Sequence, residues 1–317
     1  MSNSELVAEF PEWTVEKIAS KVGVDERRVA ALSETATDMA VAAAERLFAQ
    51  RDDISRDEVD FVILCTQSPD YYLPTSACLI QHRLGLRTNI GAFDFNLGCS
   101  GYVYGLAIAK GLVAGGVARC VLLLTAETYN KYIHPKDKGN RTIFGDAATA
   151  TIVSDNGDAE IGEFVLGTDG AGAENLIVRS GASRTPNAVN DLTFDDNGNP
   201  NSSDHLFMNG AEIFSFTQSN VPKVVKETMS KNGIEQEYID LFVFHQANRY
   251  MLNFLRKKMK IDEQKFYVNM SKIGNTVSNS IPIALCDAQN EGVLHGNVLL
   301  SGFGVGYSWG GVILKYK

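Results

Sequence analysis

Residues 94–105 read DFNLGCSGYVYG and join the end of an apolar strand to the start of a long apolar helix. Cys99 lies at this junction, directly after Gly98. Unpaired backbone N–H groups and the helix dipole favour negative charge at a helix N-terminus, so we expect the Cys99 thiol to ionise readily. Most free cysteines are small buried apolar residues, however, and this stretch alone does not decide between the two roles.

Composition restricts the classes of protein to which the chain can belong. Its 317 residues are 44% hydrophobic and 21% charged, which is typical of one large globular domain or two fused halves. The formal net charge of −9 argues against a nucleic-acid binder. The five cysteines have no metal-ligand spacing, so we expect no zinc site and reduced thiols.

The chain carries no recognisable targeting or membrane segment. Its first residues, MSNSE, lack the basic and apolar regions of a signal peptide. No apolar run is long enough to cross a bilayer. We therefore expect a cytoplasmic protein that binds neither membrane nor metal.

Strands and helices alternate along the chain, which predicts an α/β fold. Residues 148–153 and 160–168 are predicted to be the two arms of a hairpin, and the polar stretch 181–204 an irregular excursion. The remaining strands and helices of the first half are predicted at 60–66, 75–84, 90–95, 100–114 and 120–126.

The second half repeats sequence patterns of the first half in the same order. VDFVILCTQ at 59–67 resembles IDLFVFHQ at 239–246, and GVARCVLLL at 116–124 resembles GVLHGNVLL at 292–300. Two such similarities at nearly the same spacing predict an internal duplication with a pseudo-twofold axis.

The duplication divides the chain into halves at 1–168 and 169–317 and predicts where its polar residues lie. Cys99 and Asn275 would occupy equivalent helix N-termini. His245 follows an apolar run, at the strand end where α/β sheets carry their reactive groups. Cys, His and Asn at these matched positions indicate nucleophilic catalysis more strongly than any one of them does alone.

Seven short segments spread along the chain carry a resemblance to known enzymes. They are GCSGYVYGL at 98–106, FGD at 144–146, MNGAEIF at 208–214, HQAN at 245–248, GNT at 274–276, PIAL at 282–285 and FGVGYSWG at 303–310. In these segments and their order the chain resembles the β-ketoacyl-acyl-carrier-protein synthase III family of thiolase-like condensing enzymes. The resemblance implies an α/β thiolase-like fold of two duplicated halves in a five-layer αβαβα arrangement, without the family's first strand. It leaves open whether the start site is misassigned or the fold tolerates losing an edge strand.

The family's chemistry implies a role for each of these polar residues. Cys99 would attack an acyl primer thioester and hold the acyl group covalently. His245 and Asn275 would donate hydrogen bonds to the thioester oxygen of malonyl-acyl carrier protein as carbon dioxide leaves. The resulting carbanion would attack the acyl-cysteine to give a β-ketoacyl product, with backbone N–H groups of Cys99 and Val305 as the oxyanion hole.

The resemblance also assigns binding residues but no tightly bound cofactor, since coenzyme A and phosphopantetheine thioesters are substrates. Lys17 and Lys138 fall at the adenine entrance, where they lack a flat stacking surface, which disfavours coenzyme A as the primer donor. Leu73 falls where the partner subunit of a homodimer closes the acyl pocket, which indicates a primer larger than acetyl. The coenzyme A channel is assigned to Phe144, Met208, Gly210, Phe214 and Asn248.

Residues 246–260 are predicted to form a basic helix within an acidic chain. Arg249, Arg256 and Lys260 would share one helical face, with Lys257 and Lys258 beside it. Such a face is usually only solvated. Here the resemblance implies docking of an acidic acyl carrier protein.

Other functions on the same fold stay open. Hydroxymethylglutaryl-coenzyme A synthases need a carboxylate base where this chain has Gln67, which disfavours their aldol reaction. Type III polyketide synthases share Cys-His-Asn but are usually longer, and primer-transferring acyltransferases often lose the Asn. A scaffold without activity would normally have lost the nucleophile. Since Cys99 and Asn275 are both present, we expect decarboxylative condensation.

Overall fold

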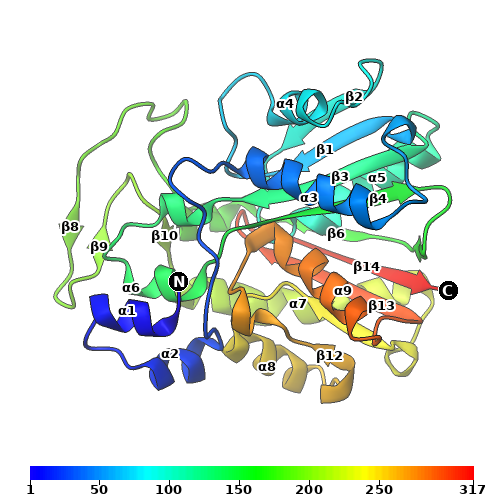
Figure 1. The fold of residues 1–317 in the computed structure, drawn as a ribbon. Helices are drawn as coiled ribbons and strands as arrows, with labels where there is room; N and C mark the ends of the chain where they lie inside the picture. The colour runs from blue at the N-terminus through cyan, green and yellow to red at the C-terminus, as the bar shows by residue number, and fades with distance from the viewer.

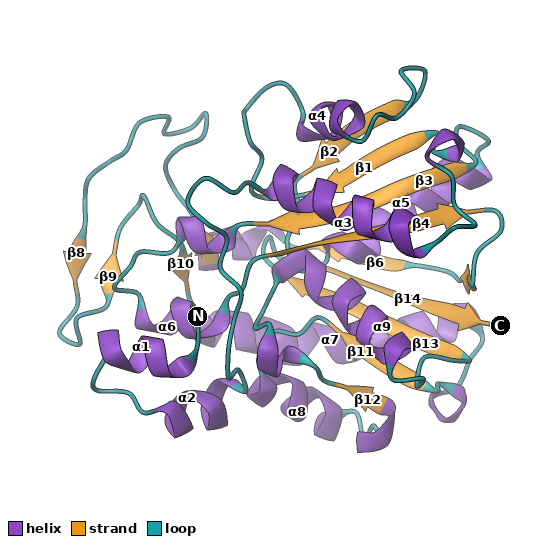
Figure 2. Ribbon diagram, in the orientation of Figure 1, coloured by secondary structure: helices purple, strands orange, loops and turns teal.

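The computed structural model describes residues 1–317, which form two mixed sheets with helices between and outside them (Figure 1; Figure 2). The elements that precede the second sheet are α1 (Asn3–Glu9), α2 (Val15–Val22), α3 (Ala36–Gln50), β1 (Phe61–Cys65), α4 (Ser76–Arg83), β2 (Gly91–Phe95), α5 (Gly101–Ala114), β3 (Cys120–Glu127), α6 (Lys138–Ile143) and β4 (Ala147–Ser154). The elements that follow are β5 (Ala159–Ile161), β6 (Val165–Thr168), β7 (Leu176–Ile177), β8 (Thr193–Phe194), β9 (Pro200–Asn201), β10 (Phe207–Met208), α7 (Gly210–Asn232), β11 (Leu241–Phe244), α8 (Arg249–Lys258), β12 (Phe266–Tyr267), α9 (Ser280–Asn290), β13 (Asn297–Gly304) and β14 (Ser308–Tyr316).

The two sheets have the same topology. In the first, with order β2-β1-β3-β4, the strands β2, β1 and β3 are parallel and β4 is antiparallel to β3. In the second, β12-β11-β13-β14 repeat this pattern of three parallel strands and one antiparallel strand. The repeat confirms the predicted duplication.

The sheets differ at one edge. The first sheet stops at β4, whereas the second continues beyond β14, which pairs with both β5 and β6. The predicted hairpin of 148–153 with 160–168 is therefore wrong, because β4 bonds to β3 and the later strands bond to β14. The division of the chain at residue 168 stays a prediction. The observed strand pairing places β5 and β6 in the sheet of the second half.

Three apolar cores separate five layers of structure. Helices α3 and α4 cover the outer face of the first sheet. Helices α5 and α9 lie between the sheets and pack against both. Helices α7 and α8 cover the outer face of the second sheet, and α2 packs on α8 beside them (Figure 1). This is the predicted αβαβα arrangement, and none of its helices is both long and apolar enough to cross a membrane.

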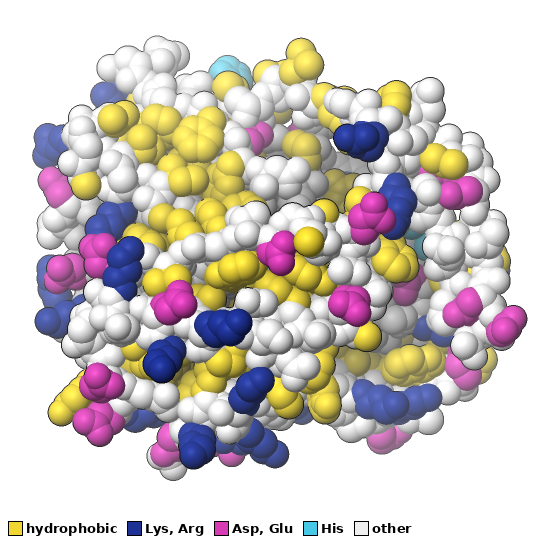
Figure 3. Space-filling view, turned by 180° about the vertical axis from the view of Figure 1, so that it is seen from behind, with side chains coloured by type: hydrophobic (Ala, Val, Ile, Leu, Met, Phe, Trp, Pro, Cys, Tyr) yellow, Lys and Arg dark blue, Asp and Glu magenta, His cyan; other side chains and the backbone are white.

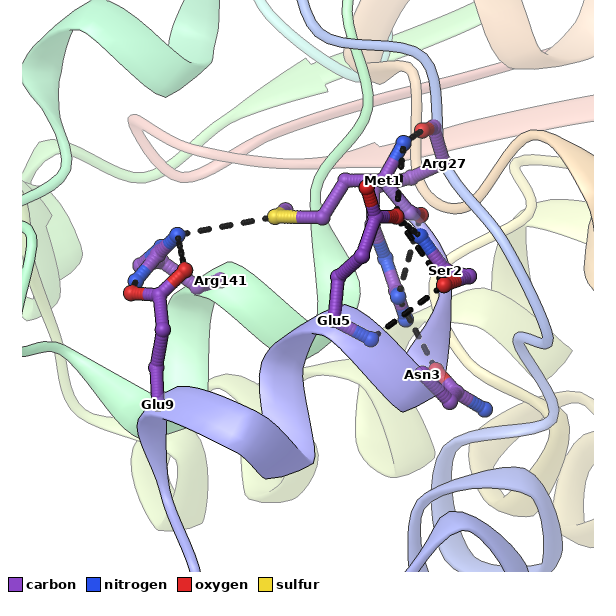
Figure 4. Close-up of polar contacts among 7 residues, drawn as sticks. All are labelled: Met1, Ser2, Asn3, Glu5, Glu9, Arg27 and Arg141. Carbon is purple, nitrogen blue, oxygen red and sulfur yellow. Dashed lines mark hydrogen bonds and ion pairs between the residues drawn. The ribbon is translucent and has the colours of Figure 1, made fainter.

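Two arginines attach the first helix to α6 (Figure 4). The buried Arg27 guanidinium donates to Asn3 Oδ1 at 2.9 Å and to the carbonyl of Thr142 at 2.8 Å. Burial lowers the pKa of Arg27 to about 10, which leaves it charged at neutral pH. Arg141 pairs with Glu9 at the other end of α1. The segment before α3 is thereby held close to residues that precede β4.

The polar excursion at 181–204 contains a small hairpin, β8–β9. Its turn is closed by Asp195, which accepts hydrogen bonds from the backbone of Asn197 and Asn199. Lys138 on α6 donates to the carbonyl of Asn197 at 2.9 Å, so the hairpin lies against the start of α6.

Helix α5 approaches β3 so closely that one of its glycines touches the sheet. A Cβ on Gly105 would lie 2.7 Å from Leu123 Cδ1, and Leu123 is fully buried. Gly111 on the exposed side of the same helix has open space around it. We expect Gly105→Ala to destabilise the fold by about 1–3 kcal/mol through overpacking. Gly111→Ala should stabilise it by about 0.5–1 kcal/mol through helix propensity.

Thermal and urea unfolding of both variants beside the parent protein measure this difference. Equal shifts of the same sign in the two variants would contradict the close approach of α5 to β3.

Candidate active site

Cys99 lies at the predicted junction, between β2 and α5. Ser100 is the N-cap residue of α5, so Cys99 immediately precedes the cap. Cys99 is only 6% exposed. The buried apolar residues clustered with it are Tyr129, Ile133, Phe144, Leu176, Leu206 and Val277.

The end of β13 passes directly beside the thiol. A Cβ on Gly304 would lie 2.8 Å from both Cβ and Sγ of Cys99. Backbone N–H groups of Val305 and of Cys99 itself reach the sulfur and lower its pKa. These are the two N–H groups that the sequence analysis assigned to the oxyanion hole.

Two serines hold this loop against the start of α5. Ser308 Oγ donates to the Val305 carbonyl at 3.0 Å. Ser100 Oγ and Ser308 Oγ are 2.5 Å apart. Since Ser308 uses its hydrogen on Val305, Ser100 is the donor of the second bond. The bonds fix the orientation of the Val305 peptide relative to Cys99.

Burial governs the ionisation of the Cys99 thiol. Burial raises the pKa of Cys99 to about 12, and the charge of Glu127 adds to the shift. The expectation that a helix N-terminus makes Cys99 a ready thiolate is therefore wrong. Loss of water around the sulfur outweighs the N–H groups, because desolvation disfavours the charged form.

His245 follows β11 directly, as predicted. Its backbone N–H donates to the carbonyl of Ser301 on β13 at 2.8 Å, and its ring meets Phe303 edge-to-face at 5.6 Å. Ring Nδ1 lies 2.8 Å from Ser280 Oγ. Burial lowers the pKa of His245 to about 3, so the imidazole is neutral at physiological pH.

Asn275 lies in a turn held by backbone bonds to the end of α6. Its N–H donates to the Ile143 carbonyl at 2.8 Å. Its side-chain Oδ1 accepts from Val277 N–H at 2.9 Å, which leaves Nδ2 as a donor, 3.4 Å from the carbonyl of Ala247. Asn275 immediately precedes Thr276, the N-cap of a 3-10 turn at Val277–Asn279 that runs directly into α9. This position is equivalent to that of Cys99, which immediately precedes the N-cap of α5.

Val277 connects the three candidate catalytic residues. Its side chain is part of the apolar cluster around Cys99, and its N–H binds Asn275 Oδ1. Its backbone also bonds to His245 and favours the protonated ring. Val277 has φ +57, which is rare for a β-branched residue and indicates backbone strain at this site. The structure thus brings Cys99, His245 and Asn275 together around one residue.

Glu127 is a buried carboxyl that the sequence analysis missed. It ends β3 and accepts hydrogen bonds from Gln67 N–H at 3.0 Å, Ser68 Oγ at 3.0 Å and Ser278 Oγ at 3.4 Å. Burial raises the pKa of Glu127 to about 8. In the sequence, its sole signal was a charged residue at the end of an apolar strand. Its bonds connect the ends of β1 and β3 to the segment that carries Asn275.

The predicted adenine entrance holds an aromatic ring as well as two lysines. Lys17 Nζ lies 4.9 Å from the centre of the Trp13 ring. Lys138 pairs with Glu12, the residue before Trp13. Lys17 was assigned from the sequence, whereas Trp13, four residues earlier and just before the Thr14 cap of α2, was missed. Trp13 supplies the flat surface that the two lysines lack.

The residues assigned to the coenzyme A channel lie in two places. Phe144 and Met208 belong to the buried cluster around Cys99. Gly210, Phe214 and Asn248 lie on the surface side, at the starts of α7 and α8. Asn248 caps α8 by accepting from the backbone of Met251, and Phe214 packs on Tyr250 and Phe254 of α8.

The basic helix is shorter than predicted. It begins at Arg249, after the Asn248 cap, and ends at Lys258. Lys260 lies beyond its end with φ +55, so it cannot share a helical face with Arg249 and Arg256.

The two arginines are also engaged elsewhere. Arg249 donates to the Gly23 carbonyl at 3.4 Å, and Arg256 pairs with Glu263 at 3.2 Å. Arg249 and Arg256 still lie seven residues apart on α8, so Lys260 is the one residue misplaced on the predicted face. Lys257, Lys258 and Lys260 are exposed. Lys and Arg side chains gather near the lower edge of the rear face, where α7 and α8 lie (Figure 3).

Leu73 does not line a pocket within its own chain. It is 82% exposed, in a loop with Tyr71 and Tyr72, which are also exposed. No group of three or more His, Cys, Asp or Glu side chains is placed to bind a metal ion.

Comparison with known proteins shows what this chain is similar to. Residues 93–170 match the family model described as 3-oxoacyl-[acyl-carrier-protein (ACP)] synthase III, and residues 229–316 match the model of that enzyme's C-terminal part. The β-ketoacyl-[acyl-carrier-protein] synthase III of Clostridium perfringens is 35% identical over 315 residues, which cover 98% of this chain and 94% of that protein.

Solved structures give the same similarity. A crystal structure of a 3-oxoacyl-(acyl-carrier-protein) synthase III is 53% identical, with a TM-score of 0.96 over 100% of this chain and 95% of that chain. The 3-oxoacyl-(acyl-carrier protein) synthase of Burkholderia xenovorans is 37% identical, with a TM-score of 0.90 over 100% of this chain and 90% of that chain.

Gly304 offers a steric test of the site. We expect Gly304→Ala to lower the rate of Cys99 acylation at least roughly tenfold, because the new Cβ would displace either the thiol or the Val305 N–H. Gly170→Ala, at a position with open space, is the control. Intact-protein mass spectrometry over time measures acylation by acetyl-, butyryl- and octanoyl-coenzyme A. Equal acylation of both variants would contradict the described contact.

Thiol alkylation tests the protonation state of Cys99. Since the pKa of Cys99 is raised to about 12, its thiolate fraction should grow about tenfold per pH unit up to pH 10. Iodoacetamide labelling, resolved by peptide mass spectrometry in a Cys78→Ser, Cys286→Ser background, measures the rate. A plateau below pH 8 would show instead that the helix N-terminus ionises the thiol.

Proposed function

The chain belongs to the 3-oxoacyl-[acyl-carrier-protein] synthase III family, and on that premise we propose that it catalyses a decarboxylative Claisen condensation. An acyl primer thioester and malonyl-acyl carrier protein would give β-ketoacyl-acyl carrier protein and carbon dioxide. In this family the enzymes are condensing acyltransferases. The observation that carries the proposal is the meeting of Cys99, His245 and Asn275 around Val277, under the N–H groups of Val305 and Cys99.

In the first half-reaction, Cys99 Sγ attacks the primer carbonyl. The tetrahedral oxyanion is stabilised by the N–H groups of Cys99 and Val305, which already converge on the sulfur. The S–C bond of the donor breaks, and its thiol leaves with the proton that Cys99 carried. Attack therefore requires no free thiolate before the primer binds, in agreement with the raised pKa of Cys99.

In the second half-reaction, the malonyl thioester loses carbon dioxide. The electron pair of the broken C–C bond enters the thioester as an enolate, whose oxygen accepts hydrogen bonds from His245 and from Asn275 Nδ2. The enolate carbon then attacks the acyl-cysteine carbonyl, and the departing Cys99 sulfur takes a proton from solvent. The neutral His245 ring supports this role, because the group acts as a hydrogen-bond donor and need not change its charge.

We propose that an acyl carrier protein docks beside the starts of α7 and α8. The exposed Lys257 and Lys258 suit an acidic partner, and the exposed Tyr250 offers an adjacent apolar contact. A phosphopantetheine arm would pass Asn248 and Gly210 toward Met208. Trp13, Lys17 and Lys138 also make coenzyme A a suitable primer donor, with the indole stacking on adenine and the lysines near phosphates.

We further propose a homodimer. Strand β2 is an edge strand without a partner on its outer side, and exposed edges favour pairing with another chain. Tyr72 and Leu73 protrude from a nearby loop and would reach the acyl pocket of the second copy. The five free cysteines support action in the reducing environment of the cytoplasm.

The alternatives have less support. The side chain of Gln67 cannot act as the carboxylate base of an aldol reaction. A primer-transferring acyltransferase would not need the Asn275 donor. Decarboxylative condensation uses all three polar residues of the site.

Separate variants test the assigned half-reactions. We expect His245→Ala and Asn275→Ala each to lower β-ketoacyl product formation by roughly 100-fold or more while Cys99 is still acylated. Asn290→Ala, at an exposed position of α9, is the control for Asn275→Ala. Mass spectrometry of the carrier protein measures product, and intact-protein mass measures the acyl-enzyme. Unimpaired condensation by both variants would rule out their role in decarboxylation.

A further inference from the structure

Ser280 is a buried hydroxyl that contacts the imidazole of His245. It is the first residue of α9 and has no exposed surface. Its Oγ lies 2.8 Å from His245 Nδ1. The same oxygen accepts a hydrogen bond from the backbone N–H of Gln246 at 3.3 Å. These two bonds place Ser280 between the end of β11 and the start of α9.

The direction of the Ser280–His245 bond follows from the number of hydrogens available. A serine hydroxyl has one hydrogen to donate and two lone pairs that accept. The Gln246 N–H occupies one lone pair, and His245 Nδ1 is the only acceptor within reach of the hydroxyl hydrogen. If Nδ1 carried a hydrogen, it could not accept one, and the buried Ser280 hydroxyl would have no acceptor for its own hydrogen. Buried donors without a partner are costly, so Ser280 donates to Nδ1.

A neutral imidazole has a single N–H, so the position of that hydrogen decides what the ring can do. Burial keeps His245 neutral, and no charged side chain faces the ring to restore a second hydrogen. With Nδ1 accepting from Ser280, the hydrogen resides on Nε2. The Val277 backbone favours a hydrogen on the ring, and Nε2 is the nitrogen that can donate it to a substrate.

We propose that Ser280 is a positioning residue that holds His245 in the Nε2–H tautomer and so aims a hydrogen-bond donor at the thioester oxygen of the extender substrate. The assignment of that substrate rests on the proposed function, whereas the tautomer itself does not. Without the Ser280 hydroxyl the ring could exchange the hydrogen between its nitrogens or rotate. The tautomer with hydrogen on Nδ1 would present a lone pair to the enolate oxygen and repel it.

The tautomer is measured directly by nitrogen NMR with ring-¹⁵N-labelled histidine. The chain has five histidines, and a His245→Gln variant assigns the signal. At pH 7 we expect a neutral ring protonated at Nε2 in the parent protein and a mixture of tautomers in Ser280→Ala. Ser278→Ala removes a buried hydroxyl that bonds to Glu127 instead, and should leave the His245 signal unchanged.

Kinetics connects the tautomer to the reaction. We expect Ser280→Ala to lower kcat for condensation roughly tenfold, because the His245 Nε2–H donor is only partly lost. The KM for malonyl-acyl carrier protein and the acylation of Cys99 should change little. Ser280→Thr keeps the hydroxyl and should restore both the NMR signal and kcat. Recovery of these two together distinguishes positioning from a general loss of packing.

Two results would overturn the proposal. One is an Nδ1–H tautomer in the parent protein, and the other is a Ser280→Ala variant with unchanged signal and unchanged kcat. A parent protein that holds the Nε2–H tautomer but forms no β-ketoacyl product would instead overturn the proposed function, and the role of Ser280 in fixing the tautomer would stand.

Discussion

The close approach of Gly304 to Cys99 is the contact on which the whole site depends. It joins the loop between β2 and α5 to the end of β13, and so connects the two duplicated sheets. Only a residue without a Cβ fits there, because an added carbon would lie 2.8 Å from the thiol. The Ser100–Ser308 hydrogen bond also joins the start of α5 to the start of β14. The Val305 N–H reaches the sulfur as a consequence.

Burial sets the charges of the site before a substrate arrives. Cys99 is a neutral thiol, His245 is a neutral imidazole, and the raised pKa of Glu127, about 8, leaves most of its carboxyl protonated at pH 7. Negative charge would appear only during the reaction, on the oxyanion and then on the enolate. Oriented N–H groups stabilise such charge most strongly where water is excluded. The site is thus suited to chemistry in which substrates supply the charge.

The sequence predicted the features that depend on local pattern and on repetition. The buried run of β1, the glycine before Cys99 and the apolar run before His245 marked strand ends correctly, and the two similar segments indicated the duplication. It could not predict partners chosen by the tertiary fold, so β5 and β6 were paired with β4 in place of β14.

The protonation state of Cys99 and the importance of Ser280 and Glu127 were equally hidden, because they arise from burial and from residues far apart in the chain. Trp13 was missed for another reason: it lies only four residues from Lys17, the residue assigned to its role.

The central claim is that Cys99 carries the acyl group between two half-reactions. Intact-protein mass spectrometry tests it most directly, after exposure of the parent protein and Cys99→Ala to a panel of acyl-coenzyme A and acyl-carrier thioesters. We expect a mass gain of one acyl group on the parent protein only, lost again when malonyl-acyl carrier protein is added. A gain of equal size on Cys99→Ala, or none on a folded parent protein that still forms β-ketoacyl product, would contradict it.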